Sequence, residues 1–257
     1  MKVFERRESA HVNVIELAWN YYAGFYDVVQ PFFLRLLGAF GDLSYDEFEE
    51  KFVKLAHVEP GQTVLDVACG TGASHPALSR AVGPKGKIVA VDISAEMLRR
   101  AKSRAQRLRL GKIGYHKADA RKLSHHFKKE SFDAVLCCNG LPHFLYPQPV
   151  LAEMTRVLRA GGTLALSTVN RDKCDDNPIW RWSMRYPKGR FPYKREYREI
   201  LKKLGIVSLK FHEQGLMLIV TAKKRAGGKS ETKRASVGSR GDATRSRKTS
   251  RRRARGL

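Results

Sequence analysis

A buried β-strand followed by a tight glycine turn is predicted by Thr63-Val64-Leu65-Asp66-Val67-Ala68-Cys69-Gly70-Thr71-Gly72. A helical segment follows at residues 74–82. Strand, turn and helix in this order form half of a nucleotide-binding α/β unit. Gly70 and Gly72 allow the backbone to approach a ligand closely, and the start of the helix offers unpaired N–H groups to it.

Two further residues narrow the choice of ligand. A dinucleotide-binding turn has a third glycine three residues after the second, and here that position is His75. The next predicted strand, residues 86–91, ends in Asp92, where a carboxylate can accept hydrogen bonds from both hydroxyls of a ribose. The pattern therefore favours an adenosine ribose that carries no pyrophosphate.

Five segments of the chain resemble the motifs of the class I S-adenosylmethionine-dependent methyltransferases, in their order and spacing. They are Asp66-x-Ala68-x-Gly70-x-Gly72, Asp92-Ile93-Ser94-x-x-Met97-Leu98, Ala118-Asp119-Ala120, Phe132-Asp133-Ala134-Val135 and Val157-Leu158-Arg159-Ala160-Gly161-Gly162-Thr163-Leu164. Ala68 replaces the first glycine of the family's acid-x-Gly-x-Gly-x-Gly motif. The resemblance covers residues 44–222 and implies an α/β fold with a Rossmann-like, seven-stranded methyltransferase sheet.

The same resemblance implies S-adenosylmethionine as the cofactor. Asp92 corresponds to the acid that binds the ribose, Asp119 to the acid that contacts the adenine amino group, and the Gly70–Gly72 turn to the methionine end. The predicted cofactor-binding residues are Asp66, Ala68, Gly70, Gly72, Asp92, Ile93, Met97, Asp119, Ala120, Asn139, Tyr22 and Tyr26. No metal site is predicted, because the four cysteines form no C-x-x-C pair.

An aromatic segment precedes this region. Its apolar residues recur every three or four positions between residues 9 and 40, which predicts an amphipathic helix with a break at Pro31. Tyr21-Tyr22-Ala23-x-x-Tyr26-Asp27 resembles the segment that small-molecule methyltransferases fold over the sulfonium, so residues 1–43 are predicted to form a helical lid. Two alternatives stay open: a helix packed on the sheet edge, and insertion of residues 32–40 into a membrane interface.

The loop after the fourth predicted strand is expected to face the transferred methyl group, because ligands bind at the carboxyl ends of strands in open α/β sheets. It contains Asn139-Gly140-Leu141-Pro142-His143 and lacks the Asn/Asp-Pro-Pro-aromatic motif of enzymes that methylate nucleic-acid amines. His143 is predicted to be catalytic, taking a proton from a phenol or an activated carbon. A structural histidine is the alternative interpretation.

Two further regions bear on the acceptor and on partners. Twelve Lys or Arg and a single acid lie between Arg99 and Lys129, which indicates a solvated helix face or a surface that binds phosphates. Residues 170–192 interleave aromatic and cationic side chains, and the segment at this place usually completes the acceptor pocket in such methyltransferases. It suits an apolar acceptor with an anionic part, or stacked bases with phosphates, or it is simply a packed surface loop.

Residues 223–257 differ in composition from the rest of the chain. They hold fourteen Lys or Arg and two acids, so half of the formal charge of +24 lies in a segment predicted to be disordered. Contact with an anionic membrane and binding of nucleic acid are two open alternatives for this segment. No run resembles a signal peptide or a membrane span, so a cytoplasmic location is expected, with peripheral membrane association as an open alternative.

These observations predict three domains: a lid at 1–43, a methyltransferase domain at 44–222 and a basic tail at 223–257. The predicted function is methyl transfer from S-adenosylmethionine to a small-molecule or lipid-like acceptor. A quinone precursor or a phospholipid headgroup is preferred, because the lid and loop resemble the ubiquinone/menaquinone C-methyltransferases and their phospholipid N-methyltransferase relatives. Two alternatives remain: an RNA methyltransferase that uses the basic helix and tail, and a non-catalytic cofactor-binding protein.

Overall fold

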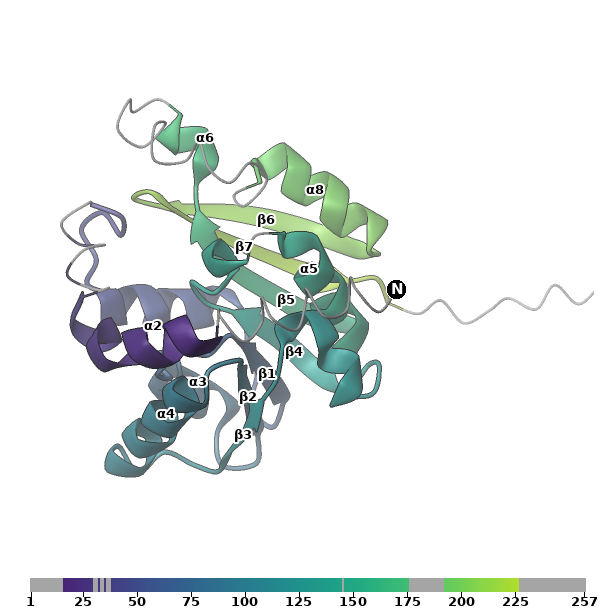
Figure 1. Ribbon diagram of the computed structural model, residues 1–257. Coiled ribbons are helices and arrows are strands. Elements are labelled where there is room, and N and C mark those ends of the chain that lie inside the picture. The colour runs from purple at the N-terminus through teal and green to yellow at the C-terminus, as the bar shows by residue number, and fades with distance from the viewer. Residues whose placement is uncertain are drawn as a thin grey trace, which may run out of the picture. The chain divides into compact units, whose positions relative to one another are not determined.

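The computed structural model describes residues 16–29, 32, 35, 38–144, 146–175 and 192–226. Its sheet has seven strands in the order β3-β2-β1-β4-β5-β7-β6 (Figure 1). The strands are β1 Thr63–Val67, β2 Lys87–Asp92, β3 Ile113–Lys117, β4 Phe132–Cys137, β5 Leu158–Val169, β6 Ile206–Gln214 and β7 Met217–Lys224. Strands β1 to β5 pair in parallel, and β7 runs antiparallel to β5 and β6. The predicted α/β fold with a seven-stranded sheet is confirmed.

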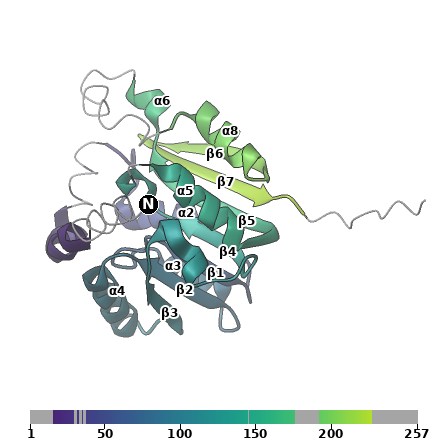
Figure 2. The same ribbon diagram turned by 45° about the vertical axis from the view of Figure 1, so that its right-hand side comes forward.

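Helices cover both faces of the sheet (Figure 2). The helices after residue 43 are α2 Tyr45–Leu55, α3 His75–Val82, α4 Ala95–Arg107, α5 Pro147–Val157, α6 Arg171–Cys174 and α8 Lys194–Lys203, with the short 3-10 turns η1 Ala120–His125 and η2 Leu141–His143. Helix α6 lies beyond the end of the sheet (Figure 2). Along β1, Val64 packs in the core layer of α2 and α3, whereas Leu65 and Val67 pack in the layer of α5 and α8. Because the central strands are buried on both faces, they read as nearly continuous apolar runs.

Helix α2 begins at a capping box formed by Ser44 and Glu47. The Oγ of Ser44 accepts the Glu47 N–H at 3.3 Å, and the Glu47 Oε2 accepts the Ser44 N–H at 2.7 Å. Phe48 and Phe52 are fully buried beneath this helix. Glu49 lies on the same helix and is almost as deeply buried, with 3% of its surface exposed.

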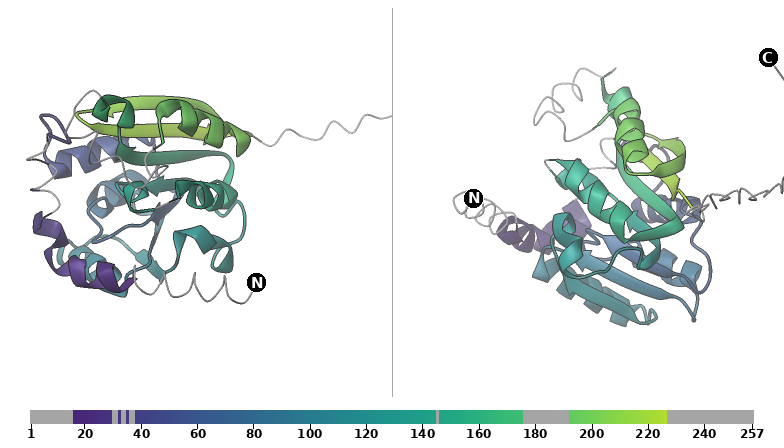
Figure 3. Two further views of the ribbon diagram at one scale, coloured as in Figure 1. Left: turned by 45° about the horizontal axis from the view of Figure 1, so that its top comes forward. Right: turned by 90° about the vertical axis from the view of Figure 1, so that its right-hand side faces the viewer.

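The helical residues 16–29 lie beside α4 (Figure 3). Oδ1 of Asn20 accepts the hydroxyl of Ser94 at 2.6 Å and the backbone N–H of Glu96 at 3.2 Å, and Asp27 lies 3.6 Å from Arg104. These contacts attach the segment to the start and to the basic side of α4. Part of the basic helix surface is therefore covered by the protein itself.

The hairpin of β6 and β7 closes one edge of the sheet (Figure 3). The last two residues of β7 are still paired in the sheet, Lys223 with Thr163 of β5 and Lys224 with Ile206 of β6. The sheet therefore continues two residues past the predicted domain boundary at residue 222.

The remainder of the predicted basic tail, from residue 227, lies outside the described residues, as do residues 176–191 of the predicted acceptor segment. Within the described ranges, no helix combines the length and apolarity needed to cross a bilayer.

Candidate cofactor-binding and active site

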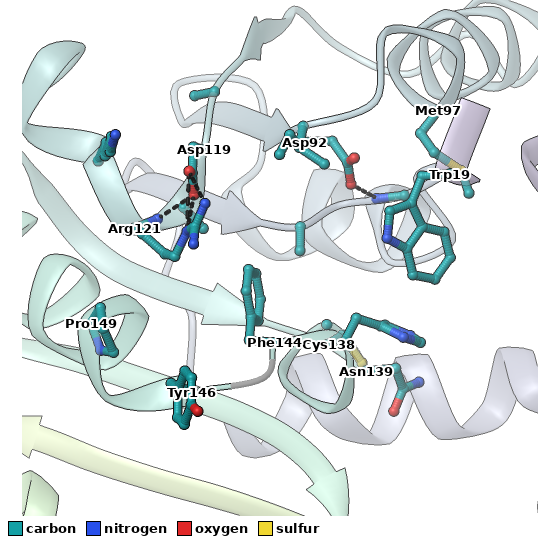
Figure 4. A pocket seen from close by; sticks show the side chains of 18 of the residues that line it. Trp19, Asp92, Met97, Asp119, Arg121, Cys138, Asn139, Phe144, Tyr146 and Pro149 are labelled. Atoms are coloured by element: carbon teal, nitrogen blue, oxygen red, sulfur yellow. Dashed lines mark hydrogen bonds and ion pairs between the residues drawn. The ribbon is translucent and has the colours of Figure 1, made fainter. Parts of the chain in front are cut away.

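A cavity of about 640 Å³ opens where β1, β2, β3 and β4 end (Figure 4). Ligand sites of open α/β sheets lie at this edge, because the loops that follow parallel strands meet there. Ten residues predicted from the sequence line the cavity: Tyr26, Ala68, Gly70, Asp92, Ile93, Met97, Asp119, Ala120, Asn139 and His143. Asp66, Gly72 and Tyr22 do not line it.

The turn after β1 has a backbone that only small residues tolerate. Gly72 has a φ of +76°, and a Cβ built there would lie 2.4 Å from Nδ1 of His75. His75 thus occupies the space beside the turn and lies 3.3 Å from the buried carboxylate of Asp66. Ala68 has a φ of +55°, a region that alanine enters at a cost of about 1–2 kcal/mol. The positive φ at residue 68 explains why related motifs usually have glycine where this chain has alanine.

Asp92 is held rigidly at the tip of β2. Its Oδ2 accepts the N–H of Gly70 and its Oδ1 the N–H of Ser94, both at 2.9 Å. Burial raises the pKa of this carboxyl group above its ordinary value. Each carboxylate oxygen accepts more than one hydrogen bond, so Asp92 keeps acceptor capacity toward the cavity, where Figure 4 shows it between Asp119 and Trp19.

Asp119 lies at the far end of the cavity in a bidentate pair with Arg121 (Figure 4). The Arg121 guanidinium donates to both oxygens, at 3.0 Å from Nε to Oδ1 and 2.7 Å from Nη2 to Oδ2. Burial alone would raise the pKa of Asp119, but the hydrogen bonds and charge of Arg121 hold it below its ordinary value. Asp119 is therefore a fixed carboxylate that can accept a further N–H donor.

The loop after β4 is fixed by Ser167 on β5. The Ser167 hydroxyl accepts the backbone N–H of Asn139 at 2.7 Å and donates to the Asn139 Oδ1 at 2.9 Å. Asn139 has a φ of +54° and is 4% exposed. Within the described part of the chain, its Nδ2 has no hydrogen-bond partner. A buried amide donor at the cavity wall is thus available to a ligand.

Aromatic rings from residues 16–29 also line the cavity, those of Trp19 and Tyr26. The ring centroids of Trp19 and His143 are 4.5 Å apart in an edge-to-face contact, and Trp19 also contacts the rings of Tyr22 and Tyr26 at 5.8 and 6.4 Å. Tyr26 approaches the glycine turn, with its ring 3.9 Å from a Cβ position on Gly70. The N-terminal helical segment therefore contacts both the cofactor turn and the predicted catalytic histidine.

Four lining residues lie outside every segment for which a cofactor-binding or catalytic role was predicted: Arg121, Lys122, Tyr146 and Pro149. Trp19 belongs to the predicted lid, and Cys138 and Phe144 flank residues 139–143 of the predicted loop, but none of the three was named as a site residue. Phe144 and Tyr146 lie one and three residues after His143, and their position after the fourth strand was a usable signal. The helical spacing of Trp19 placed it in the predicted lid, whereas Arg121 reaches the cavity beside Asp119, with which it pairs, and its place in a charged run did not indicate this. Among the described residues, no cluster of three or more His, Cys, Asp or Glu side chains is arranged to hold a metal ion.

A family model described as a methyltransferase domain matches residues 58–205, more than half of the chain. The chain belongs to this family. The matched range contains the glycine turn, Asp92, Asp119 and the loop after β4, whereas Trp19 and Tyr26 of the cavity lining precede it. The predicted family and the predicted cofactor, S-adenosylmethionine, agree with this membership.

Curated relatives of this methyltransferase include two enzymes named for quinone biosynthesis. The ubiquinone/menaquinone biosynthesis C-methyltransferase of Methylococcus capsulatus is 34% identical over 61% of this chain and 60% of its own length. The demethylmenaquinone methyltransferase of Oceanobacillus iheyensis is 39% identical over 43% of this chain and 45% of its own length. The chain thus spans about half of the length of these relatives. A S-adenosylmethionine-dependent methyltransferase of Aquifex aeolicus has a similar structure, with a TM-score of 0.57 and 27% identity over 68% of this chain and 89% of that one.

The cavity fits S-adenosylmethionine by its own features. Its volume of about 640 Å³ lies within the usual range for small-molecule sites. Asp92 offers acceptors for ribose hydroxyls, Asp119 an acceptor for an amino group, and Gly70 a surface without a side chain. The unpartnered Nδ2 of Asn139 adds a donor in the same wall.

Proposed function

We propose that this methyltransferase transfers a methyl group from S-adenosylmethionine to a small, lipid-like acceptor of the quinone type. The observation that carries the proposal is that three aromatic side chains, those of Trp19, Phe144 and Tyr146, line the same cavity as the predicted cofactor residues, because an apolar aromatic ring packs well against aromatic side chains. The quinone-biosynthesis names of the relatives support the same class of acceptor.

The protein's part in this reaction is to bind and orient the reactants. Asp92 binds the ribose and Asp119 the adenine amino group, while the turn at Gly70 accommodates the methionine end. S-adenosylmethionine supplies an electrophilic methyl group on a positively charged sulfur. Trp19 and Tyr26 exclude water from this region and present aromatic faces, which favour a cation. Residues 16–29 thus act as a lid that also positions the acceptor.

His143 serves as the proton acceptor. Its ring lines the cavity and is held at a fixed angle by the edge-to-face contact with Trp19. A quinol or phenol becomes nucleophilic at ring carbon when its hydroxyl proton leaves, and an imidazole nitrogen of His143 takes that proton. The rest of the rate enhancement comes from positioning and from the exclusion of water.

The test is methyl transfer from radiolabelled S-adenosylmethionine to three purified acceptors: a reduced demethylmenaquinone, phosphatidylethanolamine in vesicles, and total RNA. We expect label in the quinol alone. Label in phosphatidylethanolamine would replace the quinone by a phospholipid amine, and label in RNA would overturn the lipid-like acceptor altogether. Binding of S-adenosylmethionine without any labelled product from these acceptors or from a cell extract would instead support a non-catalytic protein of the same fold.

A further inference from the structure

A second, much smaller cavity of about 10 Å³ lies next to the main one. The two cavities share Tyr26, Ala68 and Cys138 in their walls, so the small one is a side chamber at the glycine-turn end. Its volume corresponds to about one water-sized group. Polar groups dominate its lining, including the side chains of Glu49 and Asp66.

Glu49 is a buried acid to which the reaction described above gives no task. It is 3% exposed, and within the described residues its Oε2 has no hydrogen-bond partner. Its carboxyl group interacts with Cys138 and Tyr45, which are hydrogen-bond donors to it. Burial raises the pKa of Glu49 to about 7. A buried carboxyl group with an open oxygen is costly unless something pairs with it.

Asp66, the other acid that lines the chamber, cannot serve as the charge partner of Glu49. Asp66 is 2% exposed; it accepts the hydroxyl of Ser74 at 3.0 Å and lies 3.3 Å from Nε2 of His75. The described residues that line the chamber include no lysine and no arginine. Two buried carboxyl groups therefore face a chamber of one-group size with no protein cation in its wall.

We propose that this chamber binds the α-ammonium group of the methionine part of S-adenosylmethionine, with Glu49 on α2 as its charge partner. An ammonium group has the size of a water molecule and donates three hydrogen bonds, which matches the open Oε2 and the polar lining. The inference rests on the proposed function, because it assumes that the nucleoside occupies the main cavity. It adds a residue from α2, outside the five sequence motifs, to the cofactor site.

The test is calorimetric binding of two nucleosides that cannot donate a methyl group. S-adenosylhomocysteine carries the amino-acid ammonium without the sulfonium charge, and 5′-methylthioadenosine lacks the amino-acid part entirely. We expect Glu49→Gln to weaken S-adenosylhomocysteine by roughly 10- to 100-fold, the range for a lost charge-assisted hydrogen bond. The same change should alter 5′-methylthioadenosine by less than about twofold, since that ligand has no ammonium to lose.

Glu50→Gln is the matched control, because Glu50 is the next residue on α2 and its side chain is 55% exposed. It should leave both affinities unchanged. Glu49→Asp keeps the charge on a shorter side chain and should recover part of the S-adenosylhomocysteine affinity, which a purely structural role of Glu49 would not produce. Circular dichroism shows whether each variant is folded before it is measured.

Three outcomes separate the inference from the function on which it rests. An unchanged S-adenosylhomocysteine affinity in folded Glu49→Gln overturns the ammonium site. An equal loss for both nucleosides also overturns it, because the effect would then not depend on the ammonium. If the unmodified protein binds neither nucleoside, the cofactor site itself, and with it the proposed function, is wrong.

Discussion

Replacing Glu49 by glutamine is expected to stabilise the cofactor-free protein by an amount that grows as the pH rises from about 4.5 to about 7. The carboxyl group has an ordinary pKa of 4.5, which burial raises to about 7 in the folded protein. Because the folded state holds the proton more tightly than the unfolded chain, the unmodified protein loses stability as the pH rises from about 4.5 to about 7. Glutamine has the same shape but does not titrate, so the free energy of unfolding of the variant does not fall over this pH range.

The magnitude follows from the size of the pKa shift. One pKa unit corresponds to 1.36 kcal/mol, and the shift from 4.5 to about 7 therefore gives roughly 3 kcal/mol. For a domain of this size, each kcal/mol changes the Tm by roughly 2–4 °C. We expect the Tm values of the two proteins to coincide near pH 4.5 and to differ by roughly 6–12 °C at pH 8, with the variant higher.

Thermal unfolding followed by circular dichroism between pH 4.5 and pH 8, without cofactor, measures the Tm difference, and urea unfolding under the same conditions measures the difference in the free energy of unfolding. Glu50→Gln provides the baseline for an exposed acid on the same helix. A stability difference that does not change with pH would refute the reasoning, and so would a variant that is less stable than the unmodified protein at pH 8. Saturating S-adenosylhomocysteine should remove much of the variant's advantage, because the bound ammonium then stabilises the charged Glu49.

Three further substitutions test other parts of the site. Gly72→Ala places a Cβ 2.4 Å from Nδ1 of His75 at a φ of +76°, so the free energy of unfolding should fall by roughly 1–3 kcal/mol, as measured in urea. Asp92→Asn removes the charge that accepts the ribose hydroxyls and should weaken 5′-methylthioadenosine by roughly 10- to 100-fold in calorimetry; an unchanged affinity would contradict the role of Asp92. His143→Gln should lower kcat by about 100-fold or more with the S-adenosylhomocysteine Kd unchanged, whereas a structural histidine would mainly lower the Tm.

The cofactor turn was predictable because its determinants are local. A strand that is buried on both faces is apolar throughout, and the glycine at position 72 is needed by its own backbone conformation, so both can be read from neighbouring residues. Asp92 was predictable for the same reason: it stands at the last residue of β2, and strand ends of one parallel sheet meet at one edge. These features do not depend on where distant segments pack.

The contacts that complete the site were not predictable in this way. Glu49 follows an ordinary capping box, and only the packing of α2 against the sheet turns its carboxyl group inward to 3% exposure. The pairing of Arg121 with Asp119 likewise gives a basic residue a role inside the cavity that its position in a charged run did not indicate. Sequence spacing cannot distinguish such a side chain from a solvated one, because burial is a property of the assembled layers.

The sequence by itself determined the order of the strands along the chain, the glycine turn and the acids at two strand ends, because each depends on residues close together in the chain. Tertiary structure alone decided that Trp19 contacts His143, at 4.5 Å between their ring centroids, and that Glu49 opens into a chamber beside the cofactor turn. Both arrangements join segments far apart in the sequence, and side chains from such segments meet only when the hydrophobic layers between them are packed.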